Sequence, residues 1–182
     1  MKLAICGELG AGCTEVGQLL CKRLGMKCIN SSDVVKRLML DFGESFEGFE
    51  VHVRSGELDL DKMIDGKIDE MLEQEDLIVE GRSGFMLFNN KDVFIVLLTA
   101  TADSRAGHVA KRRGIEFEEA KIAVRQSDEE RAGMVKRLFN KQWLDPHNYH
   151  MTINTALVSL EAAADSITRA FSRMSTSDTV VG

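Results

Sequence analysis

The sequence predicts an α/β fold, with a parallel sheet of about five strands, helices on both faces of the sheet and a helical lid. Short apolar runs alternate along the chain with stretches of helical periodicity. Residues 93–98 are an uninterrupted apolar run of the kind buried on both faces of a parallel sheet. A glycine-rich turn, GELGAGCTE from Gly7 to Glu15, follows the first apolar run. Ligands of such sheets bind beyond the carboxyl ends of the strands.

In the first half of the chain, each element has its own signal. Residues 2–6 are apolar and end at a glycine, which predicts a buried strand. From Thr14, apolar residues recur at helical spacing until Gly25. Residues 27–30 predict a second strand, and the following Ser-Ser-Asp offers N-caps for a second helix. Residues 43–60 are polar and glycine-containing, which predicts short helices and loops, and residues 61–72 predict a helix.

The second half continues the alternation. Residues 77–79 and 93–98 predict two strands, and residues 102–113 predict a helix that ends at Gly114. Residues 117 to about 143 form a charged helical stretch, which we expect Pro146 to break. Residues 151–153 predict the last strand and residues 160–171 an amphipathic helix. We expect a single domain over residues 1–173 and a frayed tail over residues 174–182.

Composition limits the classes of partner. The chain has 182 residues, enough for one domain with a real core, and a net charge of −6. That charge argues against a nucleic-acid polymer or a membrane as the main partner, although a local arginine cluster can still bind a small anion. We find no signal peptide and no stretch of transmembrane length, so the expected location is cytoplasmic. The four cysteines lack metal-site spacing, which favours free thiols.

The glycine-rich turn from Gly7 to Glu15 looks like a phosphate-binding loop without its lysine. Gly7, Gly12 and Thr14 fill the pattern G-x-x-x-x-G-K-[ST], but Cys13 stands at the lysine position. Glycines let backbone N–H groups converge on phosphate, and the threonine hydroxyl is a magnesium ligand. The strand–loop–helix context favours phosphate binding over a turn that binds nothing. Cys13 is either an oxidisable thiol at a helix N-terminus or, as we favour, a small side chain that fits.

The order of landmarks resembles the cytidylate kinase-like branch of the nucleoside monophosphate kinases, especially its short archaeal-type members. The landmarks are GELGAGCTE, SSDVVKR, LIVEGR, the R-x5-R pair and YHMTINT, and they extend from residue 2 to about residue 171. The resemblance implies a three-layer P-loop NTPase fold, with an acceptor-binding part at about 31–75 and a lid at about 112–145. It also implies ATP as co-substrate with Mg²⁺. The expected ATP-binding residues are Gly7, Gly10, Ala11, Gly12, Cys13 and Thr14.

The resemblance also assigns an acceptor side. Ser31 and Arg37 would contact the acceptor nucleotide, and Arg82 would bind the acceptor phosphate. Asp61 and Asp65 would help to read the base, although Lys67 replaces the arginine of that family pattern. Further departures are Ile68, His108 in place of an arginine, and His150 in place of an aspartate.

Catalysis would depend on lid arginines. By resemblance, Arg112, Arg125 and Arg131 would neutralise charge on the transferring phosphoryl group, as bidentate guanidinium groups do. The alternative is a solvated, salt-bridged helix. Arg125 and Arg131 lie six residues apart, so either the helix breaks between them or only one reaches the site. Thr14 and Glu80 would hold the metal, the latter through a bound water.

The sequence therefore predicts transfer of a phosphoryl group from ATP to a nucleoside monophosphate, with CMP or dCMP as the first guess. Its partners are small-molecule nucleotides, and the oligomeric state stays open. Two alternatives remain: a catalytically weak nucleotide-binding regulatory module, which the missing lysine motivates, and a P-loop kinase for another small phosphorylated acceptor.

Overall fold

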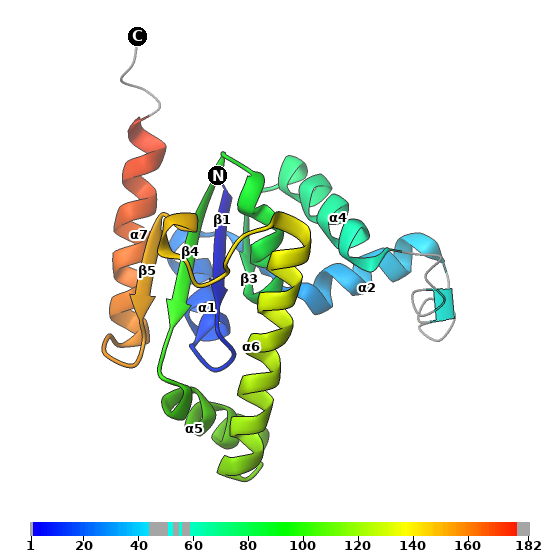
Figure 1. Cartoon of the computed structure of the whole chain (residues 1–182). Coiled ribbons are helices and arrows are strands. Elements are labelled where there is room, and N and C mark those ends of the chain that lie inside the picture. Colours follow the sequence, from blue (N-terminus) through cyan, green and yellow to red (C-terminus); the bar gives the residue numbers. More distant parts are fainter. Residues whose placement is uncertain (1, 44–50, 53–54, 56–58, 178–182) are drawn as a thin grey trace.

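The computed structural model describes residues 2–43, 51–52, 55 and 59–177 (Figure 1). Five strands form one sheet in the order β2-β3-β1-β4-β5, and every neighbouring pair is parallel. The strands are β1 (Lys2–Gly7), β2 (Lys27–Ile29), β3 (Leu77–Glu80), β4 (Val93–Thr99) and β5 (Met151–Asn154). The predicted α/β class and parallel sheet are confirmed.

Helices follow the strands as the periodicity predicts. The α-helices are α1 (Cys13–Leu24), α2 (Ser31–Phe42), α4 (Leu60–Gln74), α5 (Ala102–Arg113), α6 (Phe117–Phe139) and α7 (Leu160–Ser177). Two 3₁₀ segments are η1 (Gly81–Asn89) and η2 (Pro146–Asn148). The short helices and loops expected within residues 43–60 fall mostly outside the described residues. In Figure 1, α5 and α6 form a hairpin that extends past the carboxyl ends of β1 and β4.

The core has two halves because side chains alternate across the sheet. On β1, Leu3 and Ile5 are buried together with α1 and α7, whereas Ala4 and Cys6 face the cluster built by α2, α4, η1 and α6. A third, smaller cluster of apolar side chains joins α5 to α6. The α5–α6 hairpin thus carries its own packing and stands at the ligand-bearing edge of the sheet.

Two predicted helix ends are wrong. α6 ends at Phe139, where Asn140 takes a left-handed conformation with φ 53°, rather than being broken by Pro146. Pro146 instead begins η2. α7 continues to residue 177, past the predicted start of the frayed tail at 174, because residues 172–177 contain no glycine or proline to stop it. Residues 178–182 lie outside the described part of the chain.

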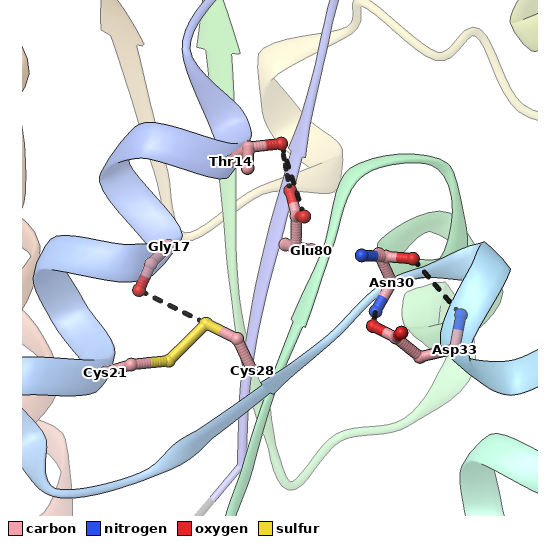
Figure 2. Close-up of a disulfide and its surroundings, with 7 residues drawn as sticks. All are labelled: Thr14, Gly17, Cys21, Cys28, Asn30, Asp33 and Glu80. Atoms are coloured by element: carbon pink, nitrogen blue, oxygen red, sulfur yellow. Dashed lines mark hydrogen bonds between the residues drawn. A yellow bond between two sulfur atoms is a disulfide. The ribbon is translucent and has the colours of Figure 1, made fainter.

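The prediction of free thiols is wrong for two of the four cysteines. Cys21 on α1 and Cys28 on β2 form a disulfide, with their Cα atoms 6.2 Å apart (Figure 2). Helix and strand approach closely here, since the Gly17 carbonyl oxygen lies 3.2 Å from the Cys28 sulfur. The chain turns back after α1, so residues seven apart meet side by side. Cys6 and Cys13 are free.

His150, which stands where the family pattern has an aspartate, is exposed and is hydrogen-bonded to β4. Its ring Nδ1 accepts a hydrogen bond from the backbone N–H of Ile95 at 3.0 Å, and the ring stacks on Phe94. The backbone N–H of His150 donates to the Ile95 carbonyl oxygen at 2.9 Å. The side chain therefore extends the pairing between β4 and the segment that leads into β5.

Candidate active site

The phosphate loop joins β1 to α1 at the carboxyl edge of the sheet. Gly10 and Gly12 have φ values of +88° and +89°, which glycine adopts without strain, and Gly12 is the N-cap of α1. Two side chains bind loop carbonyl oxygens: a ring nitrogen of His108 lies 3.1 Å from that of Gly10, and the Thr155 hydroxyl donates to that of Ala11 at 2.9 Å. The loop backbone is thus held from both sides before any ligand binds.

A pocket of about 100 Å³ opens over this loop. Four elements contribute to it: the loop with the first turn of α1, the end of β3, α5 and α6. The lining residues are Gly7, Glu8, Leu9, Gly10, Gly12, Cys13, Thr14, Glu80, Gly81, Arg112 and Arg131. The structure therefore brings most of the predicted ATP-binding residues together with two of the three predicted catalytic arginines.

Thr14 and Glu80, the two predicted metal residues, are in contact. The Thr14 hydroxyl donates to the Glu80 carboxylate at 3.1 Å, as Figure 2 shows. Burial raises the pKa of Glu80, while hydrogen bonds from Thr14 and Asn30 lower it. Mg²⁺ typically binds one or two protein oxygen ligands plus substrate phosphates and water, so a buried carboxylate beside a hydroxyl fits this ion.

Cys13 occupies the lysine position as a neutral thiol. Burial, and then the nearby Glu80 carboxylate, raise its pKa to about 12. The sulfur packs against Gly7, where a Cβ would overlap it. Because the thiolate is the reactive form, this environment argues against an oxidation-sensitive role and supports the small side chain that fits.

Arg131 brings positive charge to the same place from α6. Its Nη1 donates to the Ser127 carbonyl oxygen at 3.2 Å and to the Ser127 hydroxyl. Its Nε is buried and has no hydrogen-bond partner within the described residues. Burial lowers the pKa of Arg131. An arginine pKa begins so far above neutrality that the group remains a cation.

Arg125 lies elsewhere. α6 is continuous from Phe117 to Phe139, so of the two alternatives left by the sequence, a helix break or a single arginine at the site, the break does not occur. Arg125 lines a separate pocket of about 390 Å³ formed with Ala102, Lys121 and their neighbours. Of the two lid arginines, the structure thus places only Arg131 at the phosphate loop.

The predicted acceptor residues divide into two groups. The hydroxyls of Ser31 and Ser83 are 2.7 Å apart, which links the start of α2 to η1 beside the end of β3. Arg82 lies against α6: its Nε donates to the Met134 sulfur at 3.3 Å and its Nη1 to the Glu130 carboxylate at 3.5 Å. Ser31 and Arg82 therefore both lie at η1, which follows Glu80 at the end of β3, and Arg82 is half-exposed and engaged by a weak surface ion pair.

The other acceptor residues are engaged away from the loop. Arg37 faces Glu75, 3.9 Å away, at the opposite end of β3 from Glu80. Asp61 of α4 pairs with Arg137 of α6. Lys67 pairs with Asp41 at 2.6 Å and with Glu70 at 2.8 Å.

Asp65, on the same helix α4, has its pKa raised by burial and then by Asp69. The structure does not bring Arg37 or Lys67 to the phosphate loop.

Sequence reasoning missed a buried ionic cluster behind the loop. Arg105 of α5 pairs with Asp128 of α6 through two hydrogen bonds of 3.0 and 2.8 Å, and with Glu8 of the loop at 3.1 Å. Nothing in the periodicity of residues 102–113 distinguishes Arg105 from its charged neighbours. The available signal was Glu8, an acidic residue inside a loop expected to bind anions.

Within the described residues, no helix is both long and apolar enough to cross a membrane.

The fold and the site together define a P-loop kinase. A model of the cytidylate kinase-like family matches residues 3–157, and the chain belongs to that family. It is similar to the cytidylate kinase of Archaeoglobus fulgidus, with 30% identity over 93% of this chain and 94% of the relative. It is also 27% identical to the cytidylate kinase of Sulfolobus acidocaldarius over 95% of each chain.

Solved structures confirm the fold. An uncharacterized protein from Eubacterium ventriosum superposes with a TM-score of 0.70 at 19% identity, over 93% of this chain and 97% of that one. Shikimate kinase from Bacteroides thetaiotaomicron gives 0.60 at 15% identity, over 94% and 98% of the two chains. Family membership supports a nucleotide kinase, and these neighbours show the fold.

Proposed function

We propose that this protein transfers a phosphoryl group from ATP to a nucleoside monophosphate, and that CMP and dCMP are the first acceptors to test. One observation carries the proposal: Arg131 lines the phosphate-loop pocket together with Cys13, and its buried Nε lacks a partner in the described structure. An unpaired buried donor is costly, and a phosphate oxygen would satisfy it. Arg131 thus replaces the charge of the missing lysine.

The donor phosphates are held mainly by the main chain. In this proposal, backbone N–H groups of the glycine-rich loop would bind the phosphates, and the N-terminus of α1 adds a partial positive charge. Mg²⁺, held by Thr14 and Glu80, would neutralise charge between the donor phosphates. Arg112, which also lines the pocket, adds a second guanidinium from α5.

The acceptor would approach from the side of η1. In this proposal, Arg82 exchanges Glu130 for the acceptor phosphate, a stronger and bidentate partner. Ser31 and Ser83 orient the acceptor from the neighbouring edge. Arg82 and Arg131 then flank the group in transfer, and phosphoryl transfer depends on such positioning and charge more than on covalent chemistry.

The test is ADP release from Mg-ATP with CMP, dCMP, UMP, AMP and GMP in turn, and with a no-acceptor control. Stimulation by one monophosphate supports the proposal and identifies the base. Arg131→Met should lower kcat about 100-fold or more, as the loss of one key electrostatic contact does. Arg125→Met, on the same helix but in the other pocket, should change it less than about threefold. Equal losses would refute the assignment of Arg131.

A second candidate is a kinase for another small phosphorylated acceptor. The observation that favours it is that Asp61 and Lys67, in the segment expected to read the base, are occupied by Arg137 and by Asp41 and Glu70. Mg-ATP binding without stimulation by any of the five monophosphates would support this candidate or a weak regulatory module over the first proposal.

A further inference from the structure

Arg105 lies where the phosphate loop, α6 and the connection between β4 and α5 meet. Its guanidinium binds Glu8, the second residue of the phosphate loop, and Asp128 on the lid helix α6. Its Nε donates to the Ala100 carbonyl oxygen at 3.1 Å, and the Ala100 N–H donates to Glu8 at 2.9 Å. Arg105 and Glu8 thus bind the carbonyl oxygen and the N–H of Ala100, which lies in the connection between β4 and α5.

This cluster is costly for simple packing. Arg105 is 4% exposed and Glu8 8% exposed, and buried ion pairs are often no more stabilising than apolar residues of similar volume. The pKa of Glu8 is raised, mainly by burial. The Ala100 N–H and the Arg105 guanidinium act in the opposite direction. What such a cluster does supply is fixed geometry, because a guanidinium with two carboxylate partners accepts few arrangements.

The geometry reaches the catalytic pocket on both sides. Asp128 lies three residues before Arg131, so the two side chains are neighbours on one face of α6. On α5, His108 lies three residues after Arg105 and contacts the Gly10 carbonyl oxygen. Apolar side chains of α5 and α6 pack directly beside the cluster. Arg105 therefore connects the phosphate loop to the helix that carries Arg131.

We propose that Arg105 is a positioning residue for phosphoryl transfer, which ties the phosphate loop to α6 so that Arg131 is presented to the donor phosphates. This inference rests on the proposed kinase function. Arg105 makes no contact with the reacting groups; it acts through Arg131. Its loss should therefore impair the catalytic step more than the binding of Mg-ATP.

The experiment is a double-mutant cycle on the full chain between Arg105→Met and Arg131→Met, with kcat and the Kd of Mg-ATP as readouts. Arg105→Met alone should lower kcat about 100-fold, the effect of a misplaced catalytic group, and change the Kd less than about threefold. In the Arg131→Met background it should cost less than about threefold. Arg113→Met, an exposed arginine on the same helix, is the matched control and should change neither quantity.

A second variant covers the case in which Arg105→Met does not fold. Asp128→Asn keeps the size and one carbonyl oxygen, and it should show the same loss of effect in the Arg131→Met background. Losses of kcat that multiply in either cycle would overturn the positioning role. So would a loss of kcat no larger than the fraction of the variant that is unfolded, as measured by urea titration. Wild-type protein that neither binds Mg-ATP nor turns over would overturn the kinase proposal and this inference together, whereas an active wild type with multiplying losses refutes the inference alone.

Discussion

Gly10→Ala tests how tightly the phosphate loop is seated on α5. A Cβ at Gly10 would lie 2.6 Å from the carbonyl oxygen of Arg105, and that oxygen belongs to a helix backbone that cannot rotate away. The φ of +88° adds about 1–2 kcal/mol for a residue with a Cβ. Overpacking adds about 1–3 kcal/mol, so we expect a total loss of about 2–5 kcal/mol in the free energy of unfolding.

Gly114→Ala is the matched control. Gly114 has a φ of +66°, but a Cβ there meets no atom within 4 Å. It should therefore show only the conformational part, about 1–2 kcal/mol. Urea unfolding of both variants, followed by circular dichroism, measures the difference. Mg-ATP titration should show weaker binding for Gly10→Ala and unchanged binding for Gly114→Ala.

The reasoning fails if the two variants lose equal stability. That result would mean that α5 moves away from the loop at no cost, and that the close approach seen here does not constrain the phosphate site. Equal loss of stability together with normal Mg-ATP affinity in both variants would be the strongest form of this refutation.

Three further predictions concern the loop and its surroundings. Cys13→Lys should lower turnover, because Arg131 lines the same pocket and a second cation would compete with it there, and adding Arg131→Met should restore part of the turnover; a rise in the single variant would contradict the substitute role. Burial raises the pKa of Glu80, so the folded state favours the protonated carboxyl and this contribution is lost as pH rises through the folded pKa. Glu80→Gln should therefore raise the Tm of the nucleotide-free protein at pH 7. Thermal scans should show this difference in Tm shrinking as the pH falls toward about 4. A difference in Tm that does not change with pH would be inconsistent with the pKa shift. Reduction of Cys21–Cys28 should lower the free energy of unfolding by about 2 kcal/mol, whereas the double serine variant should be insensitive to reductant, and an equal response of both proteins would show that the bond does not form.

The sheet was predictable because its signals are local. An apolar run such as residues 93–98 is buried whatever it packs against, and glycines mark the loop wherever the rest of the chain lies. The end of α6 was not predictable in this way. Pro146 is the obvious stop in the sequence, but Asn140 takes the left-handed conformation six residues earlier.

The site depended on helix phase and long-range contacts. Six residues along a helix turn about 240°, so Arg125 and Arg131 point to different sides once the helix is continuous. The Cys21–Cys28 bond needs the face that α1 presents to β2, and the direction of Arg37 depends on Glu75 from a distant segment. Such partners are set by tertiary packing, which residue type and spacing do not encode locally.

The uninterrupted course of α6 connects the two sites of the proposed reaction through one continuous helix. Asp128 anchors it behind the phosphate loop, and Arg137, about 14 Å further along, pairs with Asp61 of α4 on the acceptor side. A movement that seats Arg131 on one nucleotide must shift the contacts at the other end. For the proposed kinase, occupancy at one site would therefore change affinity at the other, and by thermodynamic reciprocity each nucleotide would alter the binding of its counterpart by the same factor.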